Sequence, residues 1–306
     1  MTEIKVLLEK HRNYPQSVRS RLFIVFAAIC FATTGTAQQL GPDTSSPLAV
    51  ATIRFMIGSL VLFAFASTRS TTIINNIPIS KSSWLLAGFG QALYGATFFV
   101  AVRSTGVAVG TVVALGSAPL ITSAISALWF RRRPTVQLLF TTTIAIAGMA
   151  LIVTAGKRSA VTTSGVALAL CAGLGYALFA LGSKTIMSSG MSSEAAMARV
   201  FGIASLLLMP TLFFVDLDWL TSAGGIAVVL WLGIVTLAVA YWSYATGLRH
   251  LEPSETTMIT LTEPVAATLL GVVLLSERPS VVGWLGIAVV IIALFTESRL
   301  AVKNIK

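Results

Sequence analysis

Three oxygen-bearing side chains lie close together in an apolar stretch near the end of this 306-residue chain. Thr256, Thr260 and Glu263 follow one another at spacings of four and three, so a helix would carry them on one face. Glu263 comes about nine residues, or roughly 13 Å, into that helix, and a carboxylate at this depth must face protein or water. Glu263 could therefore carry a proton, bind an ammonium group or form a fixed ion pair. The threonines could contact a substrate or bond back to their own helix.

Two arginines lie in apolar stretches of the same kind. Arg54 lies in the run 49–66, and Arg199 follows 145 residues later. At about 9 Å into its own helix, Arg199 is the predicted ion-pair partner of Glu263. Both arginines could instead bind a substrate carboxylate near opposite mouths of a transport path, or extend to exposed helix carbonyls.

Pro119 and Pro264 are expected inside helices. Each would remove an N–H donor and leave the carbonyl four residues earlier, of Leu115 or Thr260, without its helical partner. Such a carbonyl could receive an ammonium group or a cation, and the proline could act as a hinge. Alternatively, the prolines only shape the bend and neighbouring hydroxyl groups bond the carbonyls.

Amide and aromatic side chains in other apolar stretches are further candidates for contact with a small molecule. Trp and Tyr near the ends of such stretches are usually anchors at a membrane interface, and Tyr241, Trp242 and Tyr244 are interpreted in this way. The candidates that lie deeper are Gln91, Tyr94 and Tyr176.

The elements that must position these residues are duplicated. The stretch 119–134 reappears as 264–279, with a proline at both ends of each copy. Its offset of 145 residues is also the offset between the two buried arginines. Arg103 and Arg249 are 146 residues apart, so one residue was gained and then lost between these anchors.

The composition predicts a membrane protein, since 56% of the residues are hydrophobic, 10% are charged and the mean hydropathy is +0.88. About twenty residues are needed to cross a bilayer as a helix. The segments long enough to do so are 22–39, 47–66, 84–102, 107–130, 136–155, 165–187, 193–215, 225–248, 254–275 and 281–296.

The duplication divides these segments five and five. An odd number of crossings inverts the second copy, so the prediction is an all-α polytopic membrane protein with ten transmembrane helices in two inverted five-helix repeats. The predicted units are a basic tail (1–21), a first repeat (22–155), a second repeat (165–297) and a short tail (298–306).

Lysine and arginine set the predicted orientation. With both termini in the cytoplasm, the inner segments carry 15 of the 21 basic residues and the outer loops carry 4. The net charge of +10 is then a result of topology, and no nucleic-acid partner is predicted. The first 37 residues could alternatively be a secretory signal, but their removal would leave the sixth segment without its repeat partner.

The residue types of a metal centre are scarce. The two histidines, His11 and His250, are far apart, and Cys30 and Cys171 both lie in apolar segments. The sequence 156–159, Gly-Lys-Arg-Ser, lacks the first glycine of a phosphate-binding loop. No metal, cofactor or enzymatic activity is predicted.

The second copy carries a motif that identifies a family by resemblance. The sequence LTEPVAATLLGVVLLSERP at 261–279, followed by GWLG at 283–286, resembles the EamA-type signature of the drug/metabolite transporter superfamily. The resemblance covers nearly the whole chain and includes the arginine after Ser-Pro-Leu-Ala at 46–49. One departure is Arg-Arg-Arg at 131–133, where the second copy has Ser-Glu-Arg at 276–278.

The resemblance implies secondary transport through a central site between the repeats, with the fifth and tenth helices outside it. It looks more like the amino-acid and metabolite exporters than the nucleotide-sugar branch. The expected protein is an exporter of small metabolites, most of all amino acids, in a bacterial inner membrane. Its further expected partners are the lipid bilayer and protons. A monomer is expected to be sufficient for function. The alternatives are a proton-coupled multidrug or amine exporter, and a membrane-embedded enzyme or scaffold.

Overall fold

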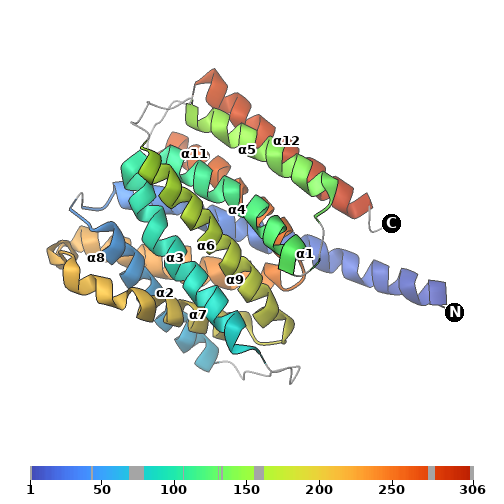
Figure 1. Ribbon diagram of the computed structural model, residues 1–306, viewed down its shortest axis with the longest axis horizontal. Coiled ribbons are helices and arrows are strands. Elements are labelled where there is room, and N and C mark those ends of the chain that lie inside the picture. The colour runs from blue at the N-terminus through green and yellow to red at the C-terminus, as the bar shows by residue number, and fades with distance from the viewer. Residues whose placement is uncertain are drawn as a thin grey trace.

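The structure is a computed structural model in which the backbone is described for residues 2–42, 44–68, 79–105, 107–129, 131, 134–154, 162–274 and 280–303. Side chains are described from residue 18 to residue 296 within these ranges, apart from 38, 39, 107–109 and 152–154. Several features of the sequence lie outside the described residues, namely 132–133, 156–161 and 275–279. All regular elements in the described ranges are helical (Figure 1).

The first copy contains α1 (Thr2–Gln39), α2 (Pro47–Ser67), α3 (Lys81–Thr105), α4 (Val107–Trp129) and α5 (Val136–Thr154). The second copy contains α6 (Thr163–Ser188), α7 (Ser193–Leu208), η1 (Met209–Phe214), η2 (Asp218–Thr221), α8 (Ala223–Gly233), η3 (Ile234–Val239), α9 (Ala240–Leu248), α10 (Pro253–Ile259), α11 (Thr262–Leu274) and α12 (Val281–Lys303).

The described part of the chain has eight helices that are long and apolar enough to cross a membrane, and two shorter apolar helices at Val136–Leu151 and Val281–Thr296. These ten apolar helices correspond one to one to the predicted segments. Large hydrophobic side chains cover their outer faces, and the exposed fraction is 64% for Phe63, 85% for Phe213 and 75% for Val273. Such surfaces are stable in lipid and not in water.

Hydroxyl side chains and prolines fix where several helices begin. Ser192, Thr162 and Ser222 accept hydrogen bonds from the third amide beyond them, at 3.4, 3.2 and 3.0 Å respectively. Pro47 and Pro253 occupy the first turns of α2 and α10, where a missing N–H costs little.

Three of the membrane helices are irregular in the second copy, the first because α7 continues as the 3-10 helix η1. A π-helical turn, η3, joins α8 to α9, and a turn at Thr260 and Leu261 separates α10 from α11. Pro264 therefore lies in the first turn of α11, whereas Pro119 lies inside the uninterrupted α4. The predicted bend near Pro264 exists, but it precedes the proline instead of being centred on it.

Contacts between the two copies follow a reciprocal pattern. In the first copy α1 packs against α9 and α11, and in the second copy α6 packs against the matching helices α3 and α4. The equivalent helices α2 and α7 pack against each other, as do α5 and α12. If each helix is replaced by its equivalent in the other copy, the same pairs of helices remain in contact. Figure 1 shows α5 and α12 side by side at one margin, outside the other helices, as the resemblance implied.

Candidate functional site

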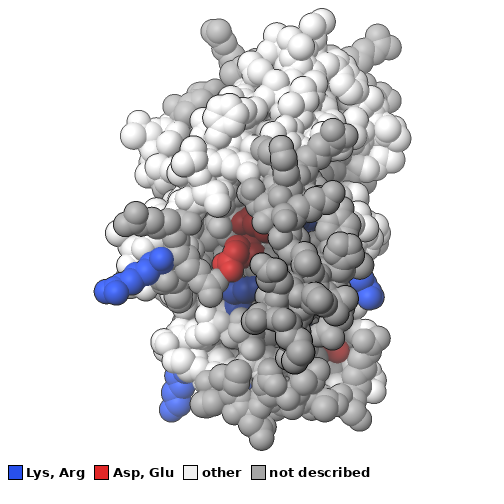
Figure 2. All heavy atoms as spheres, turned by 90° about the vertical axis from the view of Figure 1, so that its right-hand side faces the viewer, with Lys and Arg blue, Asp and Glu red and all other residues white. Residues whose placement is uncertain are grey.

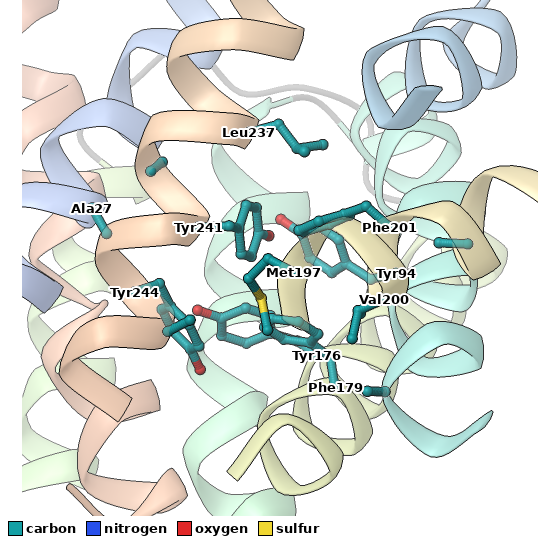
Figure 3. Packing of buried hydrophobic residues seen from close by; sticks show 14 of the residues in the cluster. Ala27, Tyr94, Tyr176, Phe179, Met197, Val200, Phe201, Leu237, Tyr241 and Tyr244 are labelled. Atoms are coloured by element: carbon teal, nitrogen blue, oxygen red, sulfur yellow. The ribbon is translucent and has the colours of Figure 1, made fainter. Parts of the chain in front are cut away.

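Four of the five tyrosines of the chain meet in the middle of the molecule (Figure 3). They come from α3 (Tyr94), α6 (Tyr176) and α9 (Tyr241 and Tyr244). Ring centroids are 5.6 Å apart between Tyr94 and Tyr176, 6.1 Å between Tyr176 and Tyr244, and 5.9 Å between Tyr241 and Tyr244. None of these side chains is more than 7% exposed.

Two phenylalanines complete this aromatic cluster. Phe179 of α6 lies 5.4 Å from Tyr241 and 5.5 Å from Tyr244, and Phe201 of α7 lies 4.6 Å from Tyr241. The cluster therefore joins one helix of the first copy to three helices of the second copy, at a place that both copies surround.

Polar groups are attached to the cluster at two points. Gln91, which is fully buried, donates from Nε2 to Tyr241 Oη at 3.1 Å, and its Oε1 has no partner among the described groups. The Tyr176 hydroxyl donates to Thr260 Oγ1 at 3.5 Å. Gln91, Tyr94, Tyr176 and Thr260, all predicted as site residues, are thus brought together.

Arg54 is buried beside the cluster and not at a mouth of the molecule. It is 5% exposed, and its guanidinium carbon lies 5.2 Å from the centroid of Phe55 and 5.1 Å from that of Phe99. No described group accepts a hydrogen bond from its Nε. Its charge acts on Tyr94, Tyr241 and Glu263, so Arg54 is the cation of the central site.

Glu263 lies in the first turn of α11, where the helix dipole favours a negative charge. Its side chain is half-buried, and Arg54 is the basic residue whose charge acts on it. No ion pair within 4.0 Å joins the two residues. The acid and the base therefore act on each other within one site without a direct ion pair.

Arg199 does not pair with Glu263, and the predicted ion pair is wrong. Its side chain is exposed on α7. Its Nη1 donates to the Met191 sulfur at 3.6 Å, and its guanidinium carbon lies 5.7 Å from the centroid of Trp84. The repeat offset predicted similar depths for the two arginines, but it carried no information on which face of the helix each one occupies.

The carbonyl groups at the break in the ninth apolar helix are bonded, contrary to the expected free acceptor at Thr260. The Glu263 amide donates to the Thr260 carbonyl at 2.9 Å, and the Leu261 amide donates to that of Met258 at 3.0 Å. The Thr260 and Thr262 hydroxyls each donate at 2.7 Å to a carbonyl three residues earlier. Tighter turns and hydroxyl groups thus replace the lost helical bonds.

The three residues predicted on one helix face have different surroundings. Thr260 bonds back to Thr257 and also accepts from Tyr176, while Thr256 is fully buried and its hydroxyl has no described partner. Glu263 follows the break in the helix and is half-buried. Helical spacing predicted one continuous face, but the helix is interrupted at Thr260 and Leu261, between Thr256 and Glu263.

Tyr241 and Tyr244 were interpreted as interface anchors, and this is wrong because they are 3% and 0% exposed. Trp242, which lies between them, points to another face, where it contacts Phe23 and Phe65. The spacing of three between the tyrosines was the available signal, since it places both rings on one face of a helix.

Comparison with known proteins agrees with this architecture. The profile of the EamA-like transporter family matches residues 19–154 and again 163–298. The uncharacterized transporter YwfM of Bacillus subtilis (strain 168) is 34% identical over 280 residues, which cover 90% of this chain and 93% of that protein. The uncharacterized inner membrane transporter YedA of Escherichia coli (strain K12) is 24% identical over 269 residues, which cover 87% and 86% of the two chains.

A solved crystal structure shares the fold, with a TM-score of 0.79 and 18% identity, over 92% of this chain and 97% of the other. The family match covers most of the chain in two adjacent copies, and the relatives named as transporters span nearly its full length. The chain is therefore a multi-pass membrane protein that belongs to the EamA-like transporter family.

Proposed function

We propose that this protein exports small zwitterionic metabolites, with amino acids as the first class, across the inner membrane. The observation that carries the proposal is the unpaired arrangement of Arg54 and Glu263 beside the aromatic cluster. A molecule with a carboxylate and an ammonium group would satisfy both charges at once.

The carboxylate end would bind Arg54. A guanidinium can hold a carboxylate by two parallel hydrogen bonds, and Arg54 has an unpartnered Nε donor. A buried cation without a hydrogen-bonded partner is costly, so occupancy by a carboxylate would lower the free energy of the site.

The ammonium end would lie between Glu263 and the aromatic faces. Tyrosine rings attract a cation by about 0.5–2 kcal/mol, and more where water is excluded. Gln91 Oε1 offers a further acceptor with no partner among the described groups. The rings are packed against each other, so a substrate would enter by separating helices of the two copies.

The contact pattern supports alternating access. Exchange of the copies preserves the contacts, and five crossings per copy would relate the copies by a pseudo-twofold axis in the membrane plane. In this proposal ten membrane helices leave both termini in the cytoplasm, an orientation supported by the excess of Lys and Arg in the segments assigned to the inner side. Rocking would bend the chain at Pro119 and at the turn before Pro264, exposing the centre to each side in alternation.

A second candidate is a proton-coupled exporter of amines or cationic drugs. The observation in its favour is the position of a carboxylate near Tyr94, Tyr176 and Tyr241, which is suited to a cation without a carboxylate. In that case Glu263 would exchange a proton for the cation, and Arg54 would help the carboxylate to release it.

Counterflow in proteoliposomes distinguishes the two candidates. Vesicles loaded with a pool of unlabelled amino acids or amines would be tested for uptake of each labelled compound. The proposal expects amino-acid uptake that is lost in Arg54→Gln and in Glu263→Gln and is retained in Arg199→Gln, the matched arginine outside the site. Amine uptake that survives Arg54→Gln would favour the second candidate, and amino-acid uptake that survives both central variants would refute this site.

A further inference from the structure

Many buried hydroxyl groups in the described part of this protein bond to a carbonyl of their own helix. Thr122 and Thr236 donate to the carbonyl four residues earlier at 2.7 and 2.8 Å, and Ser205 does so at 2.7 Å. The three side-chain hydroxyls that are buried without any described partner belong to Ser183, Tyr244 and Thr256, and each of these residues is 0% exposed.

The three unpartnered hydroxyls come from three helices that meet along one seam. Ser183 belongs to α6, Tyr244 to α9 and Thr256 to α10, and each of these helices packs against the other two. Ser183 is two turns beyond Tyr176 on α6, and Thr256 is one turn before Thr260 on α10.

The seam begins at the central site. The Tyr176 hydroxyl donates to Thr260 at 3.5 Å and points towards Tyr244 (Figure 3). The hydroxyls of Tyr176 and Tyr244 approach each other, but their geometry falls short of a hydrogen bond. Thr260 in turn accepts the amide of Glu263 through its carbonyl. The charge of Glu263 also acts on Tyr176, so the carboxylate lies near the hydroxyl at which the seam begins.

The seam ends at a charged face of the molecule. Lys184, the neighbour of Ser183, donates to the carbonyls of Leu248, Arg249 and Leu251 at 3.1, 3.0 and 2.6 Å. Figure 2 views the side on which α1 projects in Figure 1, and acidic and basic atoms of the described residues adjoin near its middle. Arg21 of α1 and Glu255 of α10 form an ion pair at 2.7 Å.

A buried hydroxyl without a partner costs about 1–3 kcal/mol, so three of them along one seam need an explanation. Ordered water is the simplest group that can both donate to and accept from such hydroxyls, and a buried water usually has about three polar partners. A bound metal cation does not fit the seam, because the seam offers it only neutral hydroxyls and the positive charge of Lys184 lies beside it.

We infer that Ser183, Tyr244 and Thr256 hold a short file of water molecules that carries protons between Glu263 and the charged end of α6. The inference rests on the proposed transport function and assigns its coupling ion. Each step passes one proton from a donor oxygen to the next acceptor oxygen, and a proton taken up at the charged end finally binds the Glu263 carboxylate.

The charged or titratable groups that face this carboxylate are Arg54, Tyr94, Tyr176 and Tyr241. Those at the charged end are Lys184, Glu194, Arg249, His250, Arg21 and Glu255.

The first test compares two modes of transport in Ser183→Ala. Ser183 does not belong to the substrate site, so counterflow without a pH gradient should stay at the wild-type rate, whereas transport driven by a pH gradient should fall at least tenfold. Ser205→Ala, which removes a buried serine that bonds its own helix, is the matched control and should change neither rate. Unchanged gradient-driven transport in Ser183→Ala would overturn the inference, and so would an equal loss in both modes.

The second test does not need a known substrate. Radiolysis by short X-ray pulses converts bound water to hydroxyl radicals that modify adjacent side chains, which mass spectrometry then locates. Modification is expected at Tyr244 and not at Phe55, an aromatic side chain that is equally buried at 0% exposure. An unmodified Tyr244 would refute the water file. Modification in a protein that transports no compound of the pool would instead show that the file is right and the proposed substrates are wrong.

Discussion

Gly90 of α3 and Gly175 of α6 lie against each other so closely that a Cβ atom on either residue would be 2.6 Å from the carbonyl oxygen of the other. The same added atoms would be 2.6 Å from the amides of Phe179 and Tyr94, respectively. The two glycines therefore allow the backbones of α3 and α6 to touch. This approach brings Tyr94 within 5.6 Å of Tyr176 and so sets the width of the aromatic cluster.

Gly90→Ala and Gly175→Ala should each destabilise the protein by about 1–3 kcal/mol, because the methyl group would meet backbone atoms that have no room to rotate away. The measurement is the midpoint of thermal unfolding in detergent. Gly35→Ala is the control, since nothing lies within 4 Å of its added methyl group and alanine favours a helix. Equal midpoints for Gly90→Ala and Gly35→Ala would show that the close approach is absent.

Arg54→Lys should preserve the charge of the site and weaken substrate binding at least tenfold, or by about 1.4 kcal/mol, because an ammonium group cannot form the paired hydrogen bonds of a guanidinium. The half-saturating concentration for amino-acid counterflow is the quantity to measure. The same substitution at Arg199 should leave it unchanged, because that side chain is exposed and remote from Glu263. If Arg54→Lys has the same half-saturating concentration as the wild type, the substrate carboxylate is not held by two hydrogen bonds from Arg54.

Arg21 and Glu255 join the two copies through both Nε and Nη2 of the arginine, at 3.0 and 2.7 Å from one carboxylate oxygen. Their side chains are only 12% and 19% exposed. Removal of one partner in Arg21→Gln should lower the free energy of unfolding by about 1.5–3 kcal/mol. The charge exchange Arg21→Glu with Glu255→Arg should recover part of that loss. A double-mutant cycle with no coupling energy would show that the pair does not hold the copies together.

His250 should titrate below the ordinary value of 6.5, because burial, and then the charges of Arg249 and Lys184, lower the pKa of its imidazole. A lowered pKa in the folded state means that the unfolded chain binds the proton first. Stability from this group is thus kept above pH 6.5 and is lost as the pH falls through the folded value. In a His11→Gln variant, NMR of the remaining imidazole gives the pKa directly. A value above 6.5 would contradict the placement of His250.

The course of the chain through the membrane was predictable because hydrophobicity and helix length fix it almost alone. Most predicted segments match the described helices within a few residues, but α1 begins at Thr2 and not at 22, α12 ends at Lys303 and not at 296, and neither η1, nor the π turn, nor the break at Thr260 was predicted. These exceptions have no signature in hydropathy. The break depends on hydroxyl groups, such as that of Thr262, which bond the carbonyl three residues earlier only when the turn tightens.

The site was predictable in part. Glu263, Gln91 and Tyr94 stood out because polar groups in apolar segments must face protein. Which arginine shares the site with Glu263 was not predictable, because the position of a residue along its helix does not reveal whether its side chain is buried, as Arg54 is, or exposed, as Arg199 is. The two tyrosines of α9 were misjudged for the related reason that distance from a helix end does not reveal whether a side chain faces lipid or neighbouring helices.

The π turn at η3 has a consequence for how the two copies diverged. It lies between Arg199 and Arg249, where the repeat offset rises from 145 to 146 residues, and a π turn holds one residue more than an α turn. In a regular α-helix an extra residue would rotate everything after it by about 100°, whereas the wider π turn takes up the extra residue within itself. Tyr241 and Tyr244 follow the turn directly, so the π turn lets the second copy hold one more residue than the first while both rings still face the centre.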